Sequence, residues 1–301
     1  MRPGSLGPAV ERALLCAELR KLRSISGETQ ESVAMACEWS LAKVYRIENG
    51  TSIVKKSDLE ALLRHYGVDD DHIQELTARA REARAPGWWE DYDFGPDRGF
   101  EAYVGYEDGA SSIRMWHPLV VPGLIQTPQY TRQIMADWSV QPEATARGVQ
   151  LREERQRRVA NRSPEQYYLL DEAVIRRPTG SVMSGQLRHL ARIAQKPSVT
   201  IRLVPFSKGL HIGLRGPFVL LGFDGPLDSI LYLENSRRGD LLIAETKDRL
   251  AGPSVLKIED PADEVAQYED AFAGLMKLAL DPEESLRLID QVAEEAEQQA
   301  P

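Results

Sequence analysis

The N-terminal part of the chain shows apolar residues at helical spacing in several short segments. In VERALLCAELRKLRSISG, four leucines fall on one face of a helix, and Gly27 is a typical residue to end it. Thr29 can cap a second helix over QESVAMAC, and LEALLRHYGV adds another apolar segment further along. Helices this short are not stable alone, so the pattern predicts a bundle of four or five of them packed on one core.

Between these segments, the stretch SLAKVYRIENG has two different faces. Ser40 is a good N-cap and Asn49-Gly50 is a stop signal, which predicts a helix of about two to three turns. Val44 and Ile47 lie on one side together with Ser40. The opposite side carries Ala42, Tyr45, Arg46 and Asn49. A short turn at Glu38-Trp39 joins this helix to the preceding one, and such a pair forms a helix-turn-helix, whose second helix lies in the DNA major groove.

The rest of the chain alternates between helical and strand-like segments. Helices are predicted near 127–138, 142–161, 183–195, 262–279 and 282–298. Strand-like runs are YYLLDEAVI, SVTIRLVPF, GPFVLLGF and SILYLEN, with LLIAE as a weaker fifth. This order predicts an α/β domain in which helices pack on a mixed sheet.

The pattern therefore predicts two domains joined by a connecting segment. We expect an all-α helix-turn-helix domain over residues 1–68 and a helix with an aromatic linker over 69–105. An α/β effector or partner-binding domain then occupies 106–301. Pro86-Gly87 marks the expected domain boundary.

Charge is divided between these parts. The chain has 301 residues, 42% of them hydrophobic, and a formal net charge of −9. Residues 1–68 carry ten Lys or Arg and eight Asp or Glu, a net charge of +2, which leaves −11 for residues 69–301. A small basic DNA reader joined to an acidic body would show this division.

Composition also bears on location and on the two cysteines. The sequence has no apolar run of about 18 residues and no secretory leader at its start, so we expect a cytoplasmic protein and no membrane partner. Cys16 and Cys37 lie in helical patterns, where inert core thiols are expected rather than a disulfide or a metal cage.

The N-terminal motifs resemble a known family. GETQESVAMACEWSLAKVYRIENG, with Thr29-Gln30, Ala34 and the run RIENG in register, resembles the xenobiotic-response-element (XRE) type of helix-turn-helix, which is related to phage repressors such as lambda repressor. The resemblance covers about residues 12–68. One position departs from the family pattern, because Glu38 stands where the turn usually has glycine, and a left-handed residue with a Cβ costs about 1 kcal/mol.

This resemblance implies roles for individual residues. Gln30 is expected to contact a phosphate, and Ala42 and Arg46 are expected to contact bases, because Arg can bind guanine O6 and N7 together and an alanine methyl can meet a thymine methyl. Lys55 and Lys56, in the loop after the third helix, suit phosphate contacts. The complete predicted DNA-binding set is Gln30, Ser40, Ala42, Lys43, Tyr45, Arg46, Asn49, Lys55 and Lys56. The alternative for the segment is a protein-docking module that does not contact DNA.

Arg23 and Glu48 occupy positions that form a partly buried ion pair in relatives. The resemblance implies that this pair ties the first helix to the third. The alternative is two solvated charges, since exposed pairs are common and weak.

The C-terminal part offers candidate binding residues but little catalytic chemistry. No phosphate-binding glycine loop, nucleophile elbow or His-Glu-x-x-His motif occurs, so we expect no enzyme, metal or cofactor. Asp240 with Glu245-Thr246-Lys247 imitates nuclease carboxylates and remains a remote alternative. The candidate ligand or partner residues are Trp88, Trp89, Trp116, His211, Arg147 and Arg158. Each also has a structural interpretation, as buried aromatics, a loop histidine or a solvated charged face.

Several separated motifs in this part resemble a second family. WHPLVVPGLIQT, LDEAVIRRP, VMSGQLRHL and GLHIGLRGPFVLL, followed by LYLEN and RRGD, resemble the actinobacterial domain of unknown function found in WhiJ-type regulators. The resemblance implies a transcriptional regulator that depends on a small protein partner encoded beside it. A ligand pocket that senses a small molecule is the alternative. We also expect a homodimer on double-stranded DNA, since one short reading helix offers few base contacts.

Overall fold

The computed structural model of the chain describes residues 6–52, 54–94, 97–138, 142–177, 181–224, 227, 229–234, 239–243 and 261–298. The chain divides into two compact units. One consists of residues 1–91 with the segment 223–228, and the other of residues 92–222 with 229–301.

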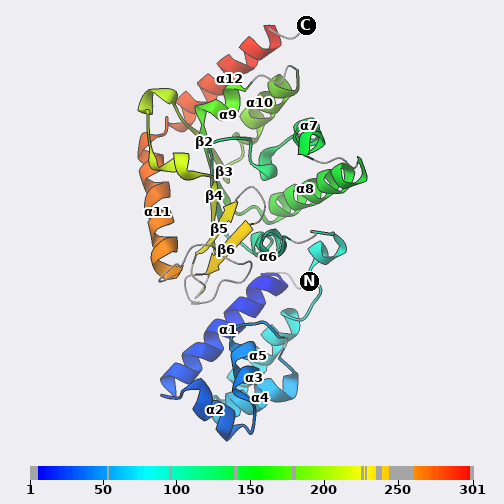
Figure 1. The fold of residues 1–301 in the computed structure, drawn as a ribbon, viewed down its shortest axis with the longest axis vertical. Coiled ribbons are helices and arrows are strands. Elements are labelled where there is room, and N and C mark those ends of the chain that lie inside the picture. The colour runs from blue at the N-terminus through cyan, green and yellow to red at the C-terminus, as the bar shows by residue number, and fades with distance from the viewer. Residues whose placement is uncertain are drawn as a thin grey trace. The chain divides into compact units, whose positions relative to one another are not determined.

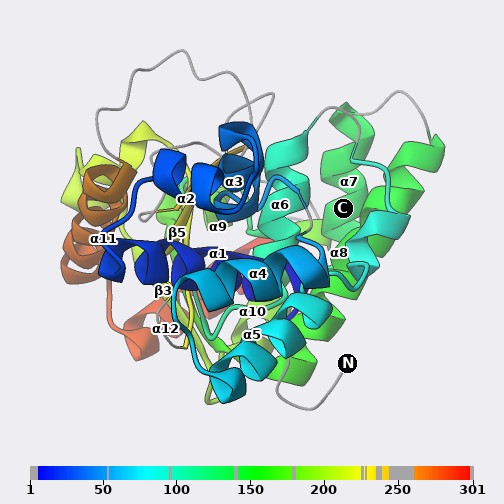
Figure 2. The same ribbon diagram turned by 90° about the horizontal axis from the view of Figure 1, so that it is seen from below.

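The N-terminal unit is built from five helices followed by a short 3-10 turn. Their bounds are α1 (Pro8–Ile25), α2 (Gln30–Ala36), α3 (Leu41–Glu48), α4 (Lys56–His65), α5 (Asp70–Glu82) and η1 (Trp88–Asp91). Helices α2 and α3 lie next to each other, and α1 contacts both α3 and α5 (Figures 1 and 2). The predicted all-α bundle is confirmed.

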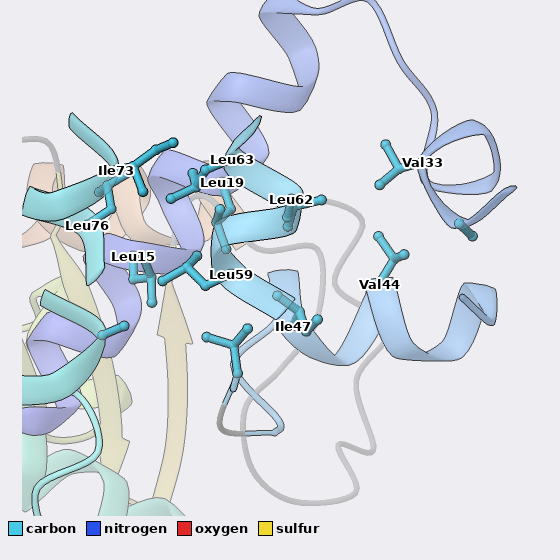
Figure 3. Packing of buried hydrophobic residues seen from close by; sticks show 13 residues of the cluster. Leu15, Leu19, Val33, Val44, Ile47, Leu59, Leu62, Leu63, Ile73 and Leu76 are labelled. Atoms are coloured by element: carbon cyan, nitrogen blue, oxygen red, sulfur yellow. The ribbon is translucent and has the colours of Figure 1, made fainter. Parts of the chain in front are cut away.

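One apolar core joins all five helices of this unit. Leu19, Val33, Val44, Leu62 and Ile73, one from each helix, belong to the same buried cluster (Figure 3). Helix α5 therefore belongs to the N-terminal unit and not to the connecting segment in which it was expected. The physical reason is its apolar stripe, formed by Ile73, Leu76 and Ala80, which is buried against this core.

The second unit contains a mixed sheet of six strands within the described residues. The strands are β1 (Ser112–His117), β2 (Glu165–Asp171), β3 (Val199–Val204), β4 (Phe218–Gly222), β5 (Ile230–Glu234) and β6 (Gly239–Ile243). Their order across the sheet is β3-β2-β1-β4-β5-β6. Strands β1, β2 and β3 run parallel, whereas β4, β5 and β6 pair in an antiparallel manner. The carboxyl ends of the three parallel strands consequently share one edge of the sheet.

Helices cover both faces of this sheet (Figure 1). They are α6 (Arg98–Glu107), α7 (Pro128–Trp138), α8 (Pro142–Arg162), α9 (Glu172–Arg176), α10 (Ser181–Ile193), α11 (Pro261–Leu278) and α12 (Pro282–Gln298), with a 3-10 turn η2 (Gly123–Ile125). On one face, Phe272 of α11 belongs to a core with Trp116 and Leu220. On the other, Tyr103 of α6 stacks on Tyr232 of β5 with ring centroids 4.4 Å apart. The predicted mixed sheet with packed helices is confirmed.

Most predicted elements of this unit are present, and the differences have local causes. The five predicted helices correspond to α7, α8, α10, α11 and α12. The strand predicted over YYLLDEAVI ends at Asp171, because this side chain accepts a hydrogen bond from the Ala173 amide at 2.8 Å and so begins helix α9. Strand β1 and helix α6 were not predicted. None of the described helices is long and apolar enough to cross a membrane.

Candidate nucleic-acid interface

Helix α3 presents one face to solvent and buries the other. The Ser40 hydroxyl accepts a hydrogen bond from the Lys43 amide at 3.3 Å, and Gly50 ends the turn after the helix with a φ of 66°. Val44 and Ile47 are buried in the core of the N-terminal unit. Leu41, Ala42, Tyr45 and Arg46 are exposed. The helix therefore exposes small, aromatic and basic side chains on one face, while the buried face fixes it to the core.

The turn before α3 has the geometry that a helix-turn-helix requires. Helix α2 begins with a capping box, in which Thr29 and Ser32 bond each other's backbone amides through their side chains. Glu38 adopts a φ of 55°, the left-handed conformation for which glycine is usual. The Trp39 amide donates to the Ala34 carbonyl at 2.8 Å and closes the end of α2. The departure at Glu38 thus leaves the turn intact.

The carboxylate of Glu48 ties three helices together. It is fully buried, and its two oxygens accept from Arg23 Nε and from Gln30 Nε2, each at 2.7 Å. Arg20 Nη1 also donates to the Glu48 carbonyl at 2.7 Å. The hydrogen bond to Glu48 raises the pKa of Arg23 above its usual value. The predicted ion pair is therefore confirmed, and the alternative of two solvated charges is wrong.

A second contact fixes the end of α3 against α1. The Cys16 thiol donates to the Ile47 carbonyl at 3.4 Å. Burial raises the pKa of this thiol to about 11, so it stays protonated at neutral pH and can act as a donor. Cys16 is the inert core thiol that its helical position predicted.

The basic side chains near α3 differ in how freely they can reach DNA. Lys43 Nζ lies 2.9 Å from Asp58 Oδ1 and 3.7 Å from the centre of the Trp39 ring. An ion pair and a cation–π contact therefore hold the Lys43 ammonium group against the protein. Lys56 Nζ lies 3.7 Å from Glu60 Oε1. Arg46 and Lys55 are both exposed, and neither forms an ion pair with a carboxylate in the described part of the chain.

The predicted phosphate contact at Gln30 is compatible with its hydrogen bond to Glu48. A side-chain amide carries two N–H donors, and only one of them is needed for Glu48. The second remains for an acceptor outside the protein. Glu48 thereby orients the residue that was predicted to bind phosphate.

The remaining candidate residues do not form one site. Trp88 and Trp89 belong to the N-terminal unit, where their rings meet edge to face at 6.1 Å and Trp89 is buried. The structure brings Trp116 and His211 together, with ring centroids 5.4 Å apart. Trp116 is fully buried in the sheet.

The two candidate arginines of α8, Arg147 and Arg158, do not act together. Arg147 is exposed, and Arg158 bonds Glu154 at 2.6 Å as part of a charged helix surface. Between them, Arg155 is buried and donates from two nitrogens to the two oxygens of Glu107, at 2.7 Å each. Tyr103 also donates its hydroxyl to Glu107. Sequence reasoning missed Glu107, because it lies 48 positions from Arg155 and nothing local identifies it as the partner.

The same unit contains a cleft between α8, α10 and the first residues of β2 and β3. Its volume is about 310 Å³. Apolar side chains such as Ile125 and Val159 line it together with polar ones such as Gln166 and His189. Burial and the nearby Arg192 lower the pKa of His189, so this side chain is neutral at pH 7. The volume of the cleft is at the lower end of the range for small-molecule sites.

The nuclease-like residues fall largely outside what the structure describes. Glu245, Thr246 and Lys247 are not among the described residues, and of Asp240 only the backbone, in β6, is described. Among the described residues, no group of three or more His, Cys, Asp or Glu is arranged to hold a metal ion.

Comparison with known families agrees with this division of the chain. Residues 14–76 match the model of a helix-turn-helix domain. Residues 100–291 match the model described as a domain of unknown function, DUF5753. No curated protein and no solved structure matches the chain.

Proposed function

The chain belongs to the DUF5753 family, and from this membership and its helix-turn-helix unit we propose that it is a sequence-specific transcriptional regulator of the XRE and WhiJ type. Helix α3 is its reading element. The single observation that carries the proposal is the exposed Arg46, which has no carboxylate partner among the described residues and projects from a helix whose other face is fixed by buried contacts.

In this proposal the exposed residues divide into base readers and phosphate contacts. Arg46 reads a base, with Ala42 and Tyr45 beside it, because a guanidinium can bind guanine bidentately. Gln30 and Lys55 contact phosphates and set the register of the helix in the groove. Lys43 contributes to DNA binding only after leaving Asp58, so its main role is to hold α3 against α4.

The test compares Arg46→Ala with Lys55→Ala on a selected operator and on random DNA. Arg46→Ala is expected to cost about 1 to 3 kcal/mol and to relax sequence preference. Lys55→Ala should weaken binding to all sequences alike and reduce the salt slope by about 1. Arg147→Ala, an exposed arginine in the other unit, is the matched control. Equal binding of wild type and Arg46→Ala to the operator would contradict the assignment.

We propose further that two copies bind together on DNA. One short reading helix makes few base contacts, and competition from genomic DNA demands more. The two half-sites should lie about 34 Å apart, or a multiple of that distance. Footprinting that shows one unrepeated site occupied by a single chain would contradict this arrangement.

The C-terminal unit is proposed to receive a signal from a small protein partner. The resemblance to WhiJ-type regulators supports this role, as does the net charge of −5 over residues 92–222 and 229–301, which have 24 Lys or Arg and 29 Asp or Glu. Partner binding should change operator affinity by about 1 to 3 kcal/mol, and operator should change partner affinity by the same factor. Purification from the native host identifies the partner. Calorimetry then measures the effect of the partner on operator affinity and the effect of the operator on partner affinity. Partner affinity that is unchanged by saturating operator would refute the coupling.

A small-molecule sensor is the second candidate, and the 310 Å³ cleft is the observation that favours it. A ligand in this cleft would raise the midpoint of thermal unfolding, and above its Kd the stabilisation would grow with the logarithm of the ligand concentration. Substitution of Val159 by tryptophan would fill the cleft and remove that effect without changing operator binding by the unliganded protein. A metabolite that binds equally to this variant would place the sensor elsewhere.

A further inference from the structure

The segment between β3 and β4 shows apolar side chains to solvent. It contains two 3-10 turns, η3 (Phe206–Lys208) and η4 (Ile212–Arg215). Four large apolar side chains of this segment are exposed, namely Phe206, Leu210, Ile212 and Leu214, and Leu210 is 93% exposed. Monomeric proteins rarely place so many apolar side chains together on the surface without a binding role.

The backbone of this segment is held firmly from beneath. Trp116 Nε1 donates to the Gly213 carbonyl at 2.8 Å, and a Cβ on Gly213 would lie only 2.5 Å from the Trp116 ring. The Phe206 amide donates to Glu172 Oε2 at 2.8 Å. His211 packs edge-on against Trp116 with its Nε2 3.4 Å from Asp171 Oδ2. The exposed side chains therefore project from an ordered frame, which lowers the entropic cost of binding a partner.

The segment lies at the edge where the parallel strands end. Trp116 is near the end of β1, Asp171 is the last residue of β2, and Phe206 follows β3. Ligands of open α/β sheets bind outside the carboxyl ends of such strands. The buried Nδ1 of His211 has no hydrogen-bond partner among the described residues, so the polar groups beneath the segment are incompletely satisfied.

Charge distinguishes this segment from the rest of its unit. Residues 205–223 contain Lys208 and Arg215 and no Asp or Glu, whereas residues 92–222 and 229–301, which form the unit, together have 24 Lys or Arg and 29 Asp or Glu, a net charge of −5. Both cations are exposed, and neither forms an ion pair with a described carboxylate. The segment is therefore a small basic and apolar surface on an acidic body, and it is complementary to an acidic and apolar partner.

We propose that this surface, formed by Phe206, Lys208, Leu210, Ile212, Leu214 and Arg215, docks an acidic amphipathic segment of another protein. This inference rests on the proposed function, since it assigns a surface and a chemistry to the partner of the C-terminal unit. A short acidic segment meets the charges that the segment itself exposes, Lys208 and Arg215, because the carboxylates of Asp171 and Glu172 beneath it are buried and bonded to the segment. An anionic membrane would face the acidic body over a wider area, and two cations contribute only about 1 kcal/mol each at such a surface.

The test uses a defined probe and the full-length protein. A fluorescent peptide of leucine and glutamate, designed as an amphipathic helix of about four turns, is titrated with wild type and variants and followed by anisotropy. The double variant Leu210→Asp, Leu214→Asp should bind about tenfold or more weakly, because two apolar contacts are replaced by like charges. Lys208→Glu should weaken binding most at low salt.

Matched controls separate this surface from general charge effects. Lys196→Glu reverses an exposed lysine before the start of β3, whereas Lys208 follows the end of that strand, so Lys196→Glu should leave peptide binding unchanged. A peptide with lysine in place of glutamate should show no dependence on Leu210. Circular dichroism verifies that the variants keep the fold, which is expected because the changed side chains are exposed.

Several outcomes would overturn the proposal. Absence of acidic-peptide binding up to about 1 mM, or equal binding to the double variant, removes the docking site. A dimer that becomes monomeric in the double variant, with no peptide binding, assigns the surface to a second copy of this chain. If wild type sediments with anionic vesicles and the double variant does not, again without peptide binding, the surface is assigned to a membrane.

The proposed function is judged by a separate measurement. If the peptide binds this surface but operator affinity does not change, the docking surface stands and the regulatory coupling fails. If a co-purified partner alters operator affinity but binds equally to the double variant, the coupling stands and the docking surface is wrong.

Discussion

Replacing Arg23 by alanine should destabilise the N-terminal unit strongly, because the buried Glu48 carboxylate then lacks its ion-pair partner. Glu48 is 0% exposed and accepts from two side chains, Arg23 and Gln30. Removal of one partner from a buried ion pair typically costs about 3 to 5 kcal/mol. The Arg23 side chain is 20% exposed, so water can partly replace it in the variant. We therefore expect a loss of about 2 to 3 kcal/mol.

This loss would be a large part of the stability of a small unit. Domains are typically stable by about 5 to 15 kcal/mol, and 2 to 3 kcal/mol changes the folding equilibrium by about 30- to 150-fold. For a unit of this size the melting midpoint should fall by about 10 to 20 °C. Operator binding should weaken as well, since Glu48, which positions the Gln30 side chain, loses its arginine partner.

Urea unfolding of the full chain, resolved by hydrogen exchange of α1, α2 and α3, measures this effect. Arg157→Ala is the matched control, because Arg157 is 65% exposed and its pair with Glu154 lies on the surface of α8. It should change stability by less than about 0.5 kcal/mol. Replacing Arg23 and Glu48 together by leucine should restore much of the loss, since the buried charge is then gone. A change below about 0.5 kcal/mol in Arg23→Ala would refute the anchoring role of the pair.

Two further substitutions test other parts of the fold. Glu38→Gly should raise the stability of the N-terminal unit by about 1 kcal/mol, because Glu38 has a φ of 55° and glycine adopts this conformation without strain. Urea unfolding measures this change, and a lower urea midpoint in the variant would contradict the turn geometry. Glu107→Gln should lower the stability of the C-terminal unit by about 3 kcal/mol, because the Arg155 side chain is only 6% exposed and would lose its carboxylate partner. Near-ultraviolet circular dichroism during unfolding measures the second effect. An unchanged midpoint would contradict the prediction and assign the compensation of Arg155 to the rings of Phe100 and Tyr103, whose centres lie 5.2 and 5.4 Å from its guanidinium carbon.

Sequence patterns predicted the N-terminal fold well because its determinants are local. Caps such as Thr29 and Ser40, stops such as Gly27 and Gly50, and apolar faces at helical spacing define each helix within a few residues. The C-terminal helices α7, α8, α10, α11 and α12 were predicted for the same reason. Helix α5 was recognised as a helix but assigned to the linker, because the pattern shows an apolar stripe without showing which core receives it.

The elements that were missed depend on contacts between distant residues. Strand β1 contains Arg114, which interrupts its apolar pattern and donates from Nη2 to Glu269 at 2.9 Å, far along the chain. The β-branched residues of DEAVI favour a strand, yet the Asp171 cap makes this run a helix. Lys43 looked like a free cation because Asp58 lies on another helix. Spacing shows which residues share a face, but it does not show which residue of another element satisfies them.

The pairing of Lys43 also changes what one reading unit can achieve on DNA. The sequence places four basic residues in or after α3, but two of these, Lys43 and Lys56, face carboxylates of the protein. Arg46 and Lys55 remain as the cations without a described carboxylate partner, and each neutralised phosphate contributes only one unit to the salt-dependent term of DNA affinity. So few contacts do not distinguish an operator from an excess of genomic DNA. The ion pair of Lys43 with Asp58 holds the reading helix against α4, and the pair of Lys56 with Glu60 lies within α4. Both pairs reduce the charge that one unit can offer to the backbone of DNA, which favours regulation by two linked units.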